Sequence, residues 1–255
     1  MPNRVSSSSA GGANGMTSRR RYDLTADPVF YVTLGIFCFL TTFLPAFLGQ
    51  PNLLPVLQTV ALTVFLAIPL RRGRIYRGVL VVSIWLLLQF LIMSIGTTLL
   101  PRPFDRAIHD GFSYYDTLLL WLHSGGGLQE PVLASPLARL GEFILVLLGS
   151  LLTAGLVGVW LLTRAVNELG FVVGLMASGG PATLLVGLMP WRVMTIAGHA
   201  GLVVLLAQPL LTNNWSPAFY IGRYRRFTGL SIILVALGLV LEYTIPGLWK
   251  GVWGY

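Results

Sequence analysis

The sequence predicts an all-α fold, a polytopic transmembrane helical bundle of about seven spans (five to seven) with one short interfacial helix. Three observations predict it: the composition, the length of the apolar runs and the distribution of arginine. Hydrophobic residues make up 55% of the 255 residues, charged residues make up only 10%, and the mean hydropathy is +0.77. Soluble domains carry about a quarter charged residues, so a bilayer is the solvent that suits this composition.

Apolar runs of spanning length, which is roughly 20 residues, recur along the chain. The two tightest junctions lie at Asn167 and at Pro190-Trp191-Arg192, and the count falls to six or five if either pair is one bent or re-entrant element. The expected spans are 28–49, 52–70, 78–100, 140–165, 168–190, 191–212 and 228–248.

These spans divide the chain into five parts. Residues 1–27 are polar and predict a flexible cytoplasmic tail, since the first apolar run begins too late and is too long for a cleavable signal peptide. Residues 28–100 hold the first three transmembrane helices, and 101–139 form an external loop. The C-terminal transmembrane bundle follows at 140–248, and 249–255 form a short tail.

Basic residues are divided unequally between the two sides of the expected bundle. With the N-terminus inside, twelve lie on cytoplasmic segments and five lie outside, so the positive-inside rule predicts a cytoplasmic N-terminus and an odd number of crossings. Arginine clusters at 71–74 and 223–226 could also dock an acidic partner or anionic lipid, although topology explains them more simply. The twelve are Arg4, Arg19, Arg20, Arg21, Arg71, Arg72, Arg74, Arg77, Arg164, Arg223, Arg225 and Arg226.

The external loop contains an aromatic and apolar stretch, 112–122, that is too short to span. Tyrosine and tryptophan favour the level of the lipid head groups, so we expect an interfacial helix that ends at Ser124-Gly125-Gly126-Gly127. An interfacial lipid-modifying enzyme could use polar residues here, but no spacing among them matches a reaction geometry, and solvated loop side chains are the simpler interpretation. The candidates are His109, Asp110, Asp116, Trp121 and His123.

Several classes of site are excluded by what the sequence lacks. Lys250 is the only lysine, so the chain has no P-loop for ATP, and it has neither a zinc-protease HExxH motif nor a GxSxG nucleophile. Cys38 is the only cysteine, which rules out an intrachain disulfide and a CxxC site. We therefore expect no metal, no cofactor, no catalytic residue and no nucleic-acid partner, and an enzyme is disfavoured rather than excluded.

Two ionisable residues lie inside the expected C-terminal spans. Counted from the external helix ends, His199 lies about eight residues deep and Glu242 about six, so the two side chains could meet. A carboxylate at the bilayer centre costs about 2.5–3.5 kcal/mol and usually has a partner. A structural hydrogen bond is one interpretation, and a proton or substrate relay is the other. Glu142 and Glu168 fall at expected segment ends, where solvation is cheap.

Ser178, Gly179, Gly180 and Pro181 form a helix-breaking motif near the middle of the expected span 168–190. Broken helices at membrane depth often form the substrate site of a transporter. The alternative is a kink that admits a neighbouring helix, because the nearby glycines also form small-residue faces suited to close packing. These glycines are Gly149, Gly155, Gly158, Gly170 and Gly174.

Residues 140–247 resemble the stage II sporulation protein M-like family of membrane proteins. The resemblance rests on a glycine-rich span around Asn167, on Pro190-Trp191 opening a helix, and on Glu242 followed by Pro246. The family's Pro-His-Gly followed by Glu is replaced by Pro190-Trp191-Arg192. The resemblance implies a non-enzymatic component of a bacterial-type inner (plasma) membrane, in some members associated with larger assemblies.

The leading hypothesis is a non-catalytic multi-pass membrane protein, a permease-like or assembly subunit of a membrane complex. Its expected partners are the lipid bilayer and a membrane or ATPase subunit. The alternatives are a secondary transporter with its site at 178–181, using His199 and Glu242, and the interfacial lipid-modifying enzyme.

Overall fold

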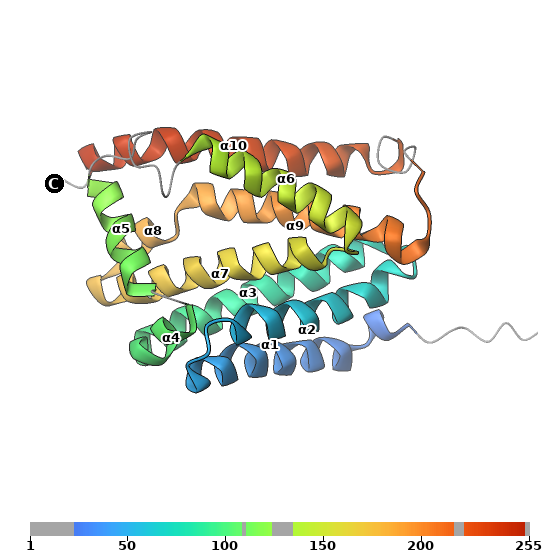
Figure 1. The fold of residues 1–255 in the computed structure, drawn as a ribbon, viewed down its shortest axis with the longest axis horizontal. Helices are drawn as coiled ribbons and strands as arrows, with labels where there is room; N and C mark the ends of the chain where they lie inside the picture. The colour runs from blue at the N-terminus through green and yellow to red at the C-terminus, as the bar shows by residue number, and fades with distance from the viewer. Residues whose placement is uncertain (1–22, 109–110, 124–134, 217–221, 253–255) are drawn as a thin grey trace, which may run out of the picture.

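The computed structural model describes residues 23–108, 111–123, 135–216 and 222–252, and every regular element within these ranges is helical (Figure 1). Six of the helices are long and apolar enough to cross a membrane. This confirms the predicted polytopic helical bundle. The six are α1 (Pro28–Leu48), α2 (Leu53–Leu70), α3 (Ile75–Leu99), α7 (Leu156–Met176), α9 (Pro190–Thr212) and α10 (Arg225–Val252).

A seventh helix carries the chain back across the bundle. Helices α3 and α7 run parallel, since Gly170 lies against Met93 and Gly174 lies against Thr97. The chain must therefore return between them, and α6 (Pro136–Leu152) does so over 17 residues, about 25 Å of helix. In Figure 1, the start of α1 and the end of α10 lie at opposite ends of the bundle, so the number of traverses is odd.

The boundaries predicted for 140–165 and 168–190 are wrong. The chain turns at Thr153 to Gly155, where Ala154 and Gly155 adopt positive φ angles of 54° and 90°. Asn167 is not a junction; it lies in the interior of α7, because its amide finds buried partners on neighbouring helices. The second half of the expected span 168–190 is a 3-10 turn (Ala177–Gly179) and the short helix α8 (Pro181–Gly187).

Short elements cap the two ends of the bundle. At the amino end, the 3-10 turn Leu24–Ala26 precedes α1, and Asp23 pairs with Arg72 (3.3 Å) and with Arg74 in the turn between α2 and α3. At the far end lie α4 (Pro101–Ile108), α5 (Gly111–His123) and α8. The aromatic helix predicted at 112–122 is confirmed as α5, whereas α4 was not predicted.

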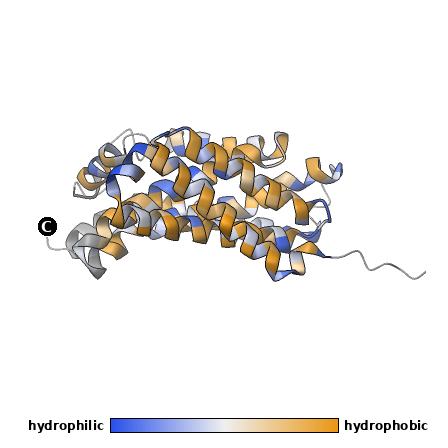
Figure 2. Cartoon of the chain, turned by 90° about the horizontal axis from the view of Figure 1, so that it is seen from below, coloured by the Kyte–Doolittle hydropathy of each residue, from blue (hydrophilic) through white to orange (hydrophobic). Residues whose placement is uncertain are grey.

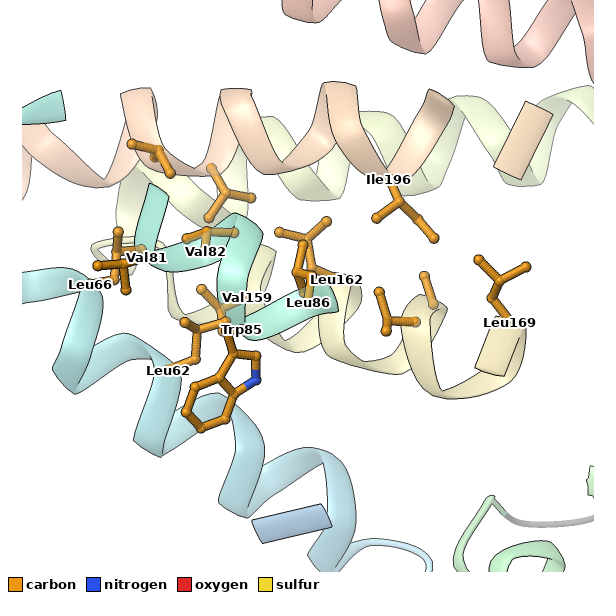
Figure 3. Close-up of a cluster of buried hydrophobic side chains, with 14 of the residues drawn as sticks. Leu62, Leu66, Val81, Val82, Trp85, Leu86, Val159, Leu162, Leu169 and Ile196 are labelled. Carbon is orange, nitrogen blue, oxygen red and sulfur yellow. The ribbon is translucent and has the colours of Figure 1, made fainter. Parts of the chain in front are cut away.

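The interior of the bundle is apolar and tightly packed. Trp85 is fully buried among leucines and valines from α2, α3 and α7 (Figure 3). Many apolar side chains are exposed, among them Phe37 and Val64, as expected where lipid replaces water. Hydrophobic residues recur along the full length of the long helices (Figure 2). Glycine allows the closest approach: a Cβ on Gly174 would lie 2.5 Å from the Ser94 carbonyl oxygen, which confirms close packing on this face.

Candidate functional site

Six charged side chains from four helices meet near the far end of the bundle. On α6, Arg139 pairs with Glu142 (2.9 Å) and reaches across to Glu242 on α10 (2.5 Å). On α7, Glu168 pairs with Arg164 (2.9 Å) and with Arg192 of α9 (2.9 Å). We call this set the ionic cluster: Arg139, Glu142, Arg164, Glu168, Arg192 and Glu242. It holds three positive and three negative side chains, so its formal charge is balanced.

The ionic cluster lies inside the helical bundle rather than beyond the helix ends. Glu168 precedes the last residue of α7, Met176, by eight positions, which places it about 12 Å along the helix from that end. Glu168 and Glu242 are not at exposed segment ends: the Glu242 side chain is only 7% exposed and that of Glu168 only 15%. The expected position of Glu168 at a segment end is thus wrong, because α7 extends through it. Arg164, which was counted with the cytoplasmic segments, also lies inside α7.

The ionic cluster borders a cleft of about 380 Å³ between α6 and α7. Besides Arg139, Glu142, Arg164, Glu168 and Arg192, its lining includes Tyr114 of α5. Burial raises the pKa of the Tyr114 phenol above its ordinary value, against the opposing influence of the Arg192 guanidinium. The phenol therefore keeps its proton and offers a hydrogen-bond donor to the cleft.

A second hollow of about 180 Å³ lies on the opposite flank of α7, between it and the ends of α2 and α4. Arg164 and Glu168 line both hollows, and Asn167 lines this second one. The polar face of α7 is therefore accessible from two sides. Arg164, with a side chain 60% exposed, is the most open member of the ionic cluster.

An uncharged polar network occupies the centre of the bundle, next to this face. Gln58 of α2, Gln89 of α3 and Asn167 of α7 are each at most 3% exposed and bond to one another. Asn167 Nδ2 donates to Gln58 Oε1 (2.7 Å), and Gln89 Nε2 donates to Asn167 Oδ1 (2.8 Å). We call these three side chains the amide network.

Further contacts close the amide network. Gln89 Nε2 also donates to the Thr163 carbonyl oxygen (2.8 Å), and the Trp85 indole donates to Gln89 Oε1 (3.0 Å). Gln58 Nε2 donates to the Thr42 hydroxyl oxygen of α1 (2.9 Å). Each of the three amides thus has hydrogen-bond partners for both its oxygen and its nitrogen. The network connects four helices, and it leaves no unsatisfied donor or acceptor for a ligand.

The structure does not bring His199 and Glu242 together. Gly198 faces Ser231 and Gly238 faces Trp191 across the α9–α10 contact, so Glu242 lies beside the first turn of α9. His199 lies deeper by about two helical turns, roughly 10 Å. Its ring stacks on Phe143 (centroids 6.2 Å apart), and its buried Nε2 has no hydrogen-bond partner within the described part of the chain. The relay through these residues remains a prediction.

The helix-breaking motif lies at the end of α7 rather than in the middle of a span. Gly180 has a φ of 106°, which only glycine adopts readily. The Thr183 hydroxyl donates to the carbonyl oxygens of Met176 (2.7 Å) and Gly180 (2.8 Å), so local contacts satisfy the carbonyls at the break. Ser178, Gly179, Gly180 and Pro181 form the turn into α8, and a substrate site there remains untested.

The candidate residues of the predicted external loop lie partly on α5 and partly outside the described residues. Asp116 is exposed on α5, and its helix also carries Trp121 and His123. His109 and Asp110 lie outside the described residues. Among the residues described, no group of three or more His, Cys, Asp or Glu side chains could hold a metal ion. The functional interest of α5 comes instead from Tyr114, which the sequence prediction placed in the aromatic stretch without a role.

The chain matches no family model, no curated protein and no solved structure. The likeness to the stage II sporulation protein M-like family therefore stays a prediction from the sequence. What the fold establishes is a multi-pass helical membrane protein with a buried amide network and, beside it, a charged cleft.

Proposed function

We propose that the chain is a permease-like membrane subunit in which the ionic cluster binds a substrate that carries both a positive and a negative charge. One observation supports this above the others: α6, α7 and α9 each place charged side chains in one cleft, and Glu242 of α10 pairs with Arg139 beside it. Charged residues are expensive inside a bilayer, and they commonly face a bundle interior or a water-filled cavity along a substrate path.

The charge balance of the ionic cluster favours a zwitterionic substrate over a simple ion. Guanidinium groups of Arg139 and Arg192 suit carboxylate or phosphate oxygens, whereas Glu142 and Glu168 suit an ammonium group. A ligand with one charge of each sign can exchange with the internal pairs and leave the net charge of the cleft unchanged. A singly charged ligand would leave one buried charge without a partner, which costs free energy.

The assembly-subunit hypothesis stays open beside the permease. It rests on the family resemblance of residues 140–247 and on the arginines at the amino end of the bundle. A membrane or ATPase partner subunit, a bacterial-type inner membrane and a cytoplasmic N-terminus belong to this proposal. Retention of a stoichiometric partner on the chain purified in mild detergent would favour assembly over independent transport.

Flux through the purified full-length chain tests the permease proposal. We would reconstitute it in proteoliposomes and measure uptake of radiolabelled neutral amino acids and glycerophosphoethanolamine, and transbilayer movement of phosphatidylethanolamine radiolabelled in its head group. At least one of these zwitterions should move faster than in protein-free vesicles. Glu168→Gln should lower that rate about tenfold or more, because it removes the charged partner of Arg192.

Arg226→Gln is the matched control, since it removes an arginine that is exposed at the amino end of α10, far from the cleft. Its flux should equal that of the unaltered protein. Equal flux for Glu168→Gln and Arg226→Gln, with both proteins folded, would refute a transport role for the ionic cluster.

A further inference from the structure

An apolar groove lies between α6 and α10 and meets the ionic cluster at Arg139. The groove encloses about 370 Å³. Its walls are apolar except at one end, where Arg139 and Tyr243 lie. They consist of Arg139, Leu140, Phe143, Ile232, Val235, Ala236, Leu239 and Tyr243.

The groove opens sideways toward the lipid. Leu140 is 53% exposed and Ile232 is 46% exposed, one from each wall. Of the six candidate spans, α10 also buries the smallest share of its surface inside the protein. A lipid chain could therefore enter between α6 and α10 without passing through water.

The length of the groove matches one leaflet of a bilayer. Along α10, Ile232 and the Glu242 that pairs with Arg139 are separated by about 15 Å of helix. The hydrocarbon of one leaflet is also about 15 Å deep, half of roughly 30 Å. The charged end of the groove faces the far end of the bundle, and its apolar end faces the middle. A lipid in the leaflet at the far end has its head group and acyl chains in the same order.

Arg139 joins the groove to the cleft, because its side chain lines both. Through it, a ligand with its chain in the groove would place its head group among Arg139, Glu142 and Tyr114. Guanidinium groups bind phosphate oxygens in paired hydrogen bonds. The carboxylates of the balanced ionic cluster are then available to an ammonium group, whereas an anionic lipid would give the ionic cluster a net negative charge.

We infer that the ligand is a membrane phospholipid with a zwitterionic phosphate–ammonium head group, with one acyl chain in the α6–α10 groove and its head group in the ionic cluster. This inference rests on the proposed function for the role of the cleft and adds to it the class of substrate. The ligand enters from the bilayer and not from water.

Photo-cross-linking of the full-length chain in nanodiscs tests the inference. The probe is phosphatidylethanolamine with a diazirine near the end of one acyl chain, and the comparison probe is phosphatidylglycerol with the same chain. Labelling should concentrate on residues 232–236, at the end of the groove away from Arg139, and it should be about fivefold higher or more for phosphatidylethanolamine, because only its head group has both charges. Equal labelling by the two lipids would overturn the inference.

Two substitutions on α10 form a matched pair. Ala236→Trp fills the groove and should lower labelling about fivefold or more, by excluding the acyl chain. Leu237→Trp adds a tryptophan to the next residue, which is 40% exposed and outside the groove, and should leave labelling unchanged. Both proteins are compared as monodisperse, folded samples, and undiminished labelling of Ala236→Trp also overturns the inference.

The outcomes separate this inference from the proposed function. Flux of a soluble zwitterion that depends on Glu168, without lipid labelling in the groove, would refute the lipid and keep the permease. Specific labelling of the groove without flux of either kind would keep the lipid site and refute transport.

Discussion

The amide network and the ionic cluster meet at consecutive positions of α7, and they offset the cost of burying polar groups in opposite ways. Asn167 belongs to the first and Glu168 to the second. The amide network is uncharged and fully hydrogen-bonded, and of its three side chains Asn167 also borders the second hollow. The ionic cluster is charged, balanced and bordered by hollows on both flanks of the helix.

The difference suggests a division of labour between structure and function. A network in which each amide already has partners can fix the mutual positions of α1, α2, α3 and α7, and it has nothing left to offer a ligand. Ion pairs beside a cleft can exchange partners, because an incoming head group or solute replaces one charged contact with another. Substitutions in each region test whether stability resides in the amide network and binding in the ionic cluster.

The largest effect on stability is expected from Asn167→Leu. This change leaves polar atoms of Gln58 and Gln89 with fewer buried partners, and we expect the free energy of unfolding to fall by about 1–3 kcal/mol. Flux or lipid binding per folded molecule should not change. Unfolding in detergent, followed by circular dichroism, measures the first quantity, with Gln50→Leu as an exposed amide control that should cost nothing.

Adding Gln58→Leu to Asn167→Leu sharpens this test. In the double variant, Gln89 still donates to the Thr163 carbonyl oxygen and still accepts from Trp85. Since no buried amide is then left without a partner, the pair should lose less stability than the sum of the single changes. Additive losses would show that the amide network does not act as a unit.

The second-largest loss of stability is expected when the pair of Arg139 and Glu242 is broken. Glu242→Gln leaves Arg139 its bond to Glu142, so we expect a moderate loss, about 1–2 kcal/mol, together with a loss of flux or of lipid labelling. In a double-mutant cycle with Arg139→Gln, the two changes should couple by about 0.5–3 kcal/mol.

A Glu242→Gln variant that loses stability but keeps full flux and labelling would break the comparison. The ionic cluster would then be a second packing device, like the amide network. The relay hypothesis for Glu242 would fall with it, because that hypothesis also requires the carboxylate for activity.

The sequence predicted the helical membrane fold well, because length and hydropathy of apolar runs are local properties. The expected ends of α1, α2 and α9 agree with the structure to within one or two residues. The error at Asn167 has a clear cause: a polar residue in an apolar run looks like a boundary unless its partners are known. The true turn, at Gly155, is marked by a glycine with a positive φ among several glycines that are helical.

The candidate site could not have been predicted from the sequence. Arg139 and Glu242 are 103 positions apart, and their meeting depends on which faces of α6 and α10 pack together. A weaker signal was present for the amide network: Gln58, Gln89 and Asn167 are single amides in three different apolar runs. Isolated amide side chains in separate spans tend to form hydrogen bonds with one another, since each must satisfy its donors and acceptors inside the bundle.

The smallest effect on stability is expected from a substitution of Asp23. Its exposed ion pair serves as a control for the buried ion pairs of the ionic cluster. Its bonds to Arg74 and Thr25 hold the pKa of the Asp23 carboxyl below its ordinary value. The pair therefore stabilises the folded chain above the unfolded pKa of about 3.9, and its contribution is lost as the pH falls through the lower folded value. Asp23→Asn should speed hydrogen exchange of the 24–27 amides at pH 7.

The salt dependence of the Asp23 pair can be compared with that of the Arg139–Glu242 pair, and this comparison tests whether salt enters the cleft. At an ionic strength of about 1 M the screening length is about 3 Å, so an exposed pair such as Asp23 with Arg74 is largely screened and Asp23→Asn should then match the unaltered chain. The Arg139–Glu242 coupling should persist in the same salt, because Glu242 is buried and a buried pair is screened much less. If both pairs lose their coupling together, salt reaches the ionic cluster as freely as it reaches the surface. The cleft would then favour a soluble zwitterion over a lipid head group that enters from the side.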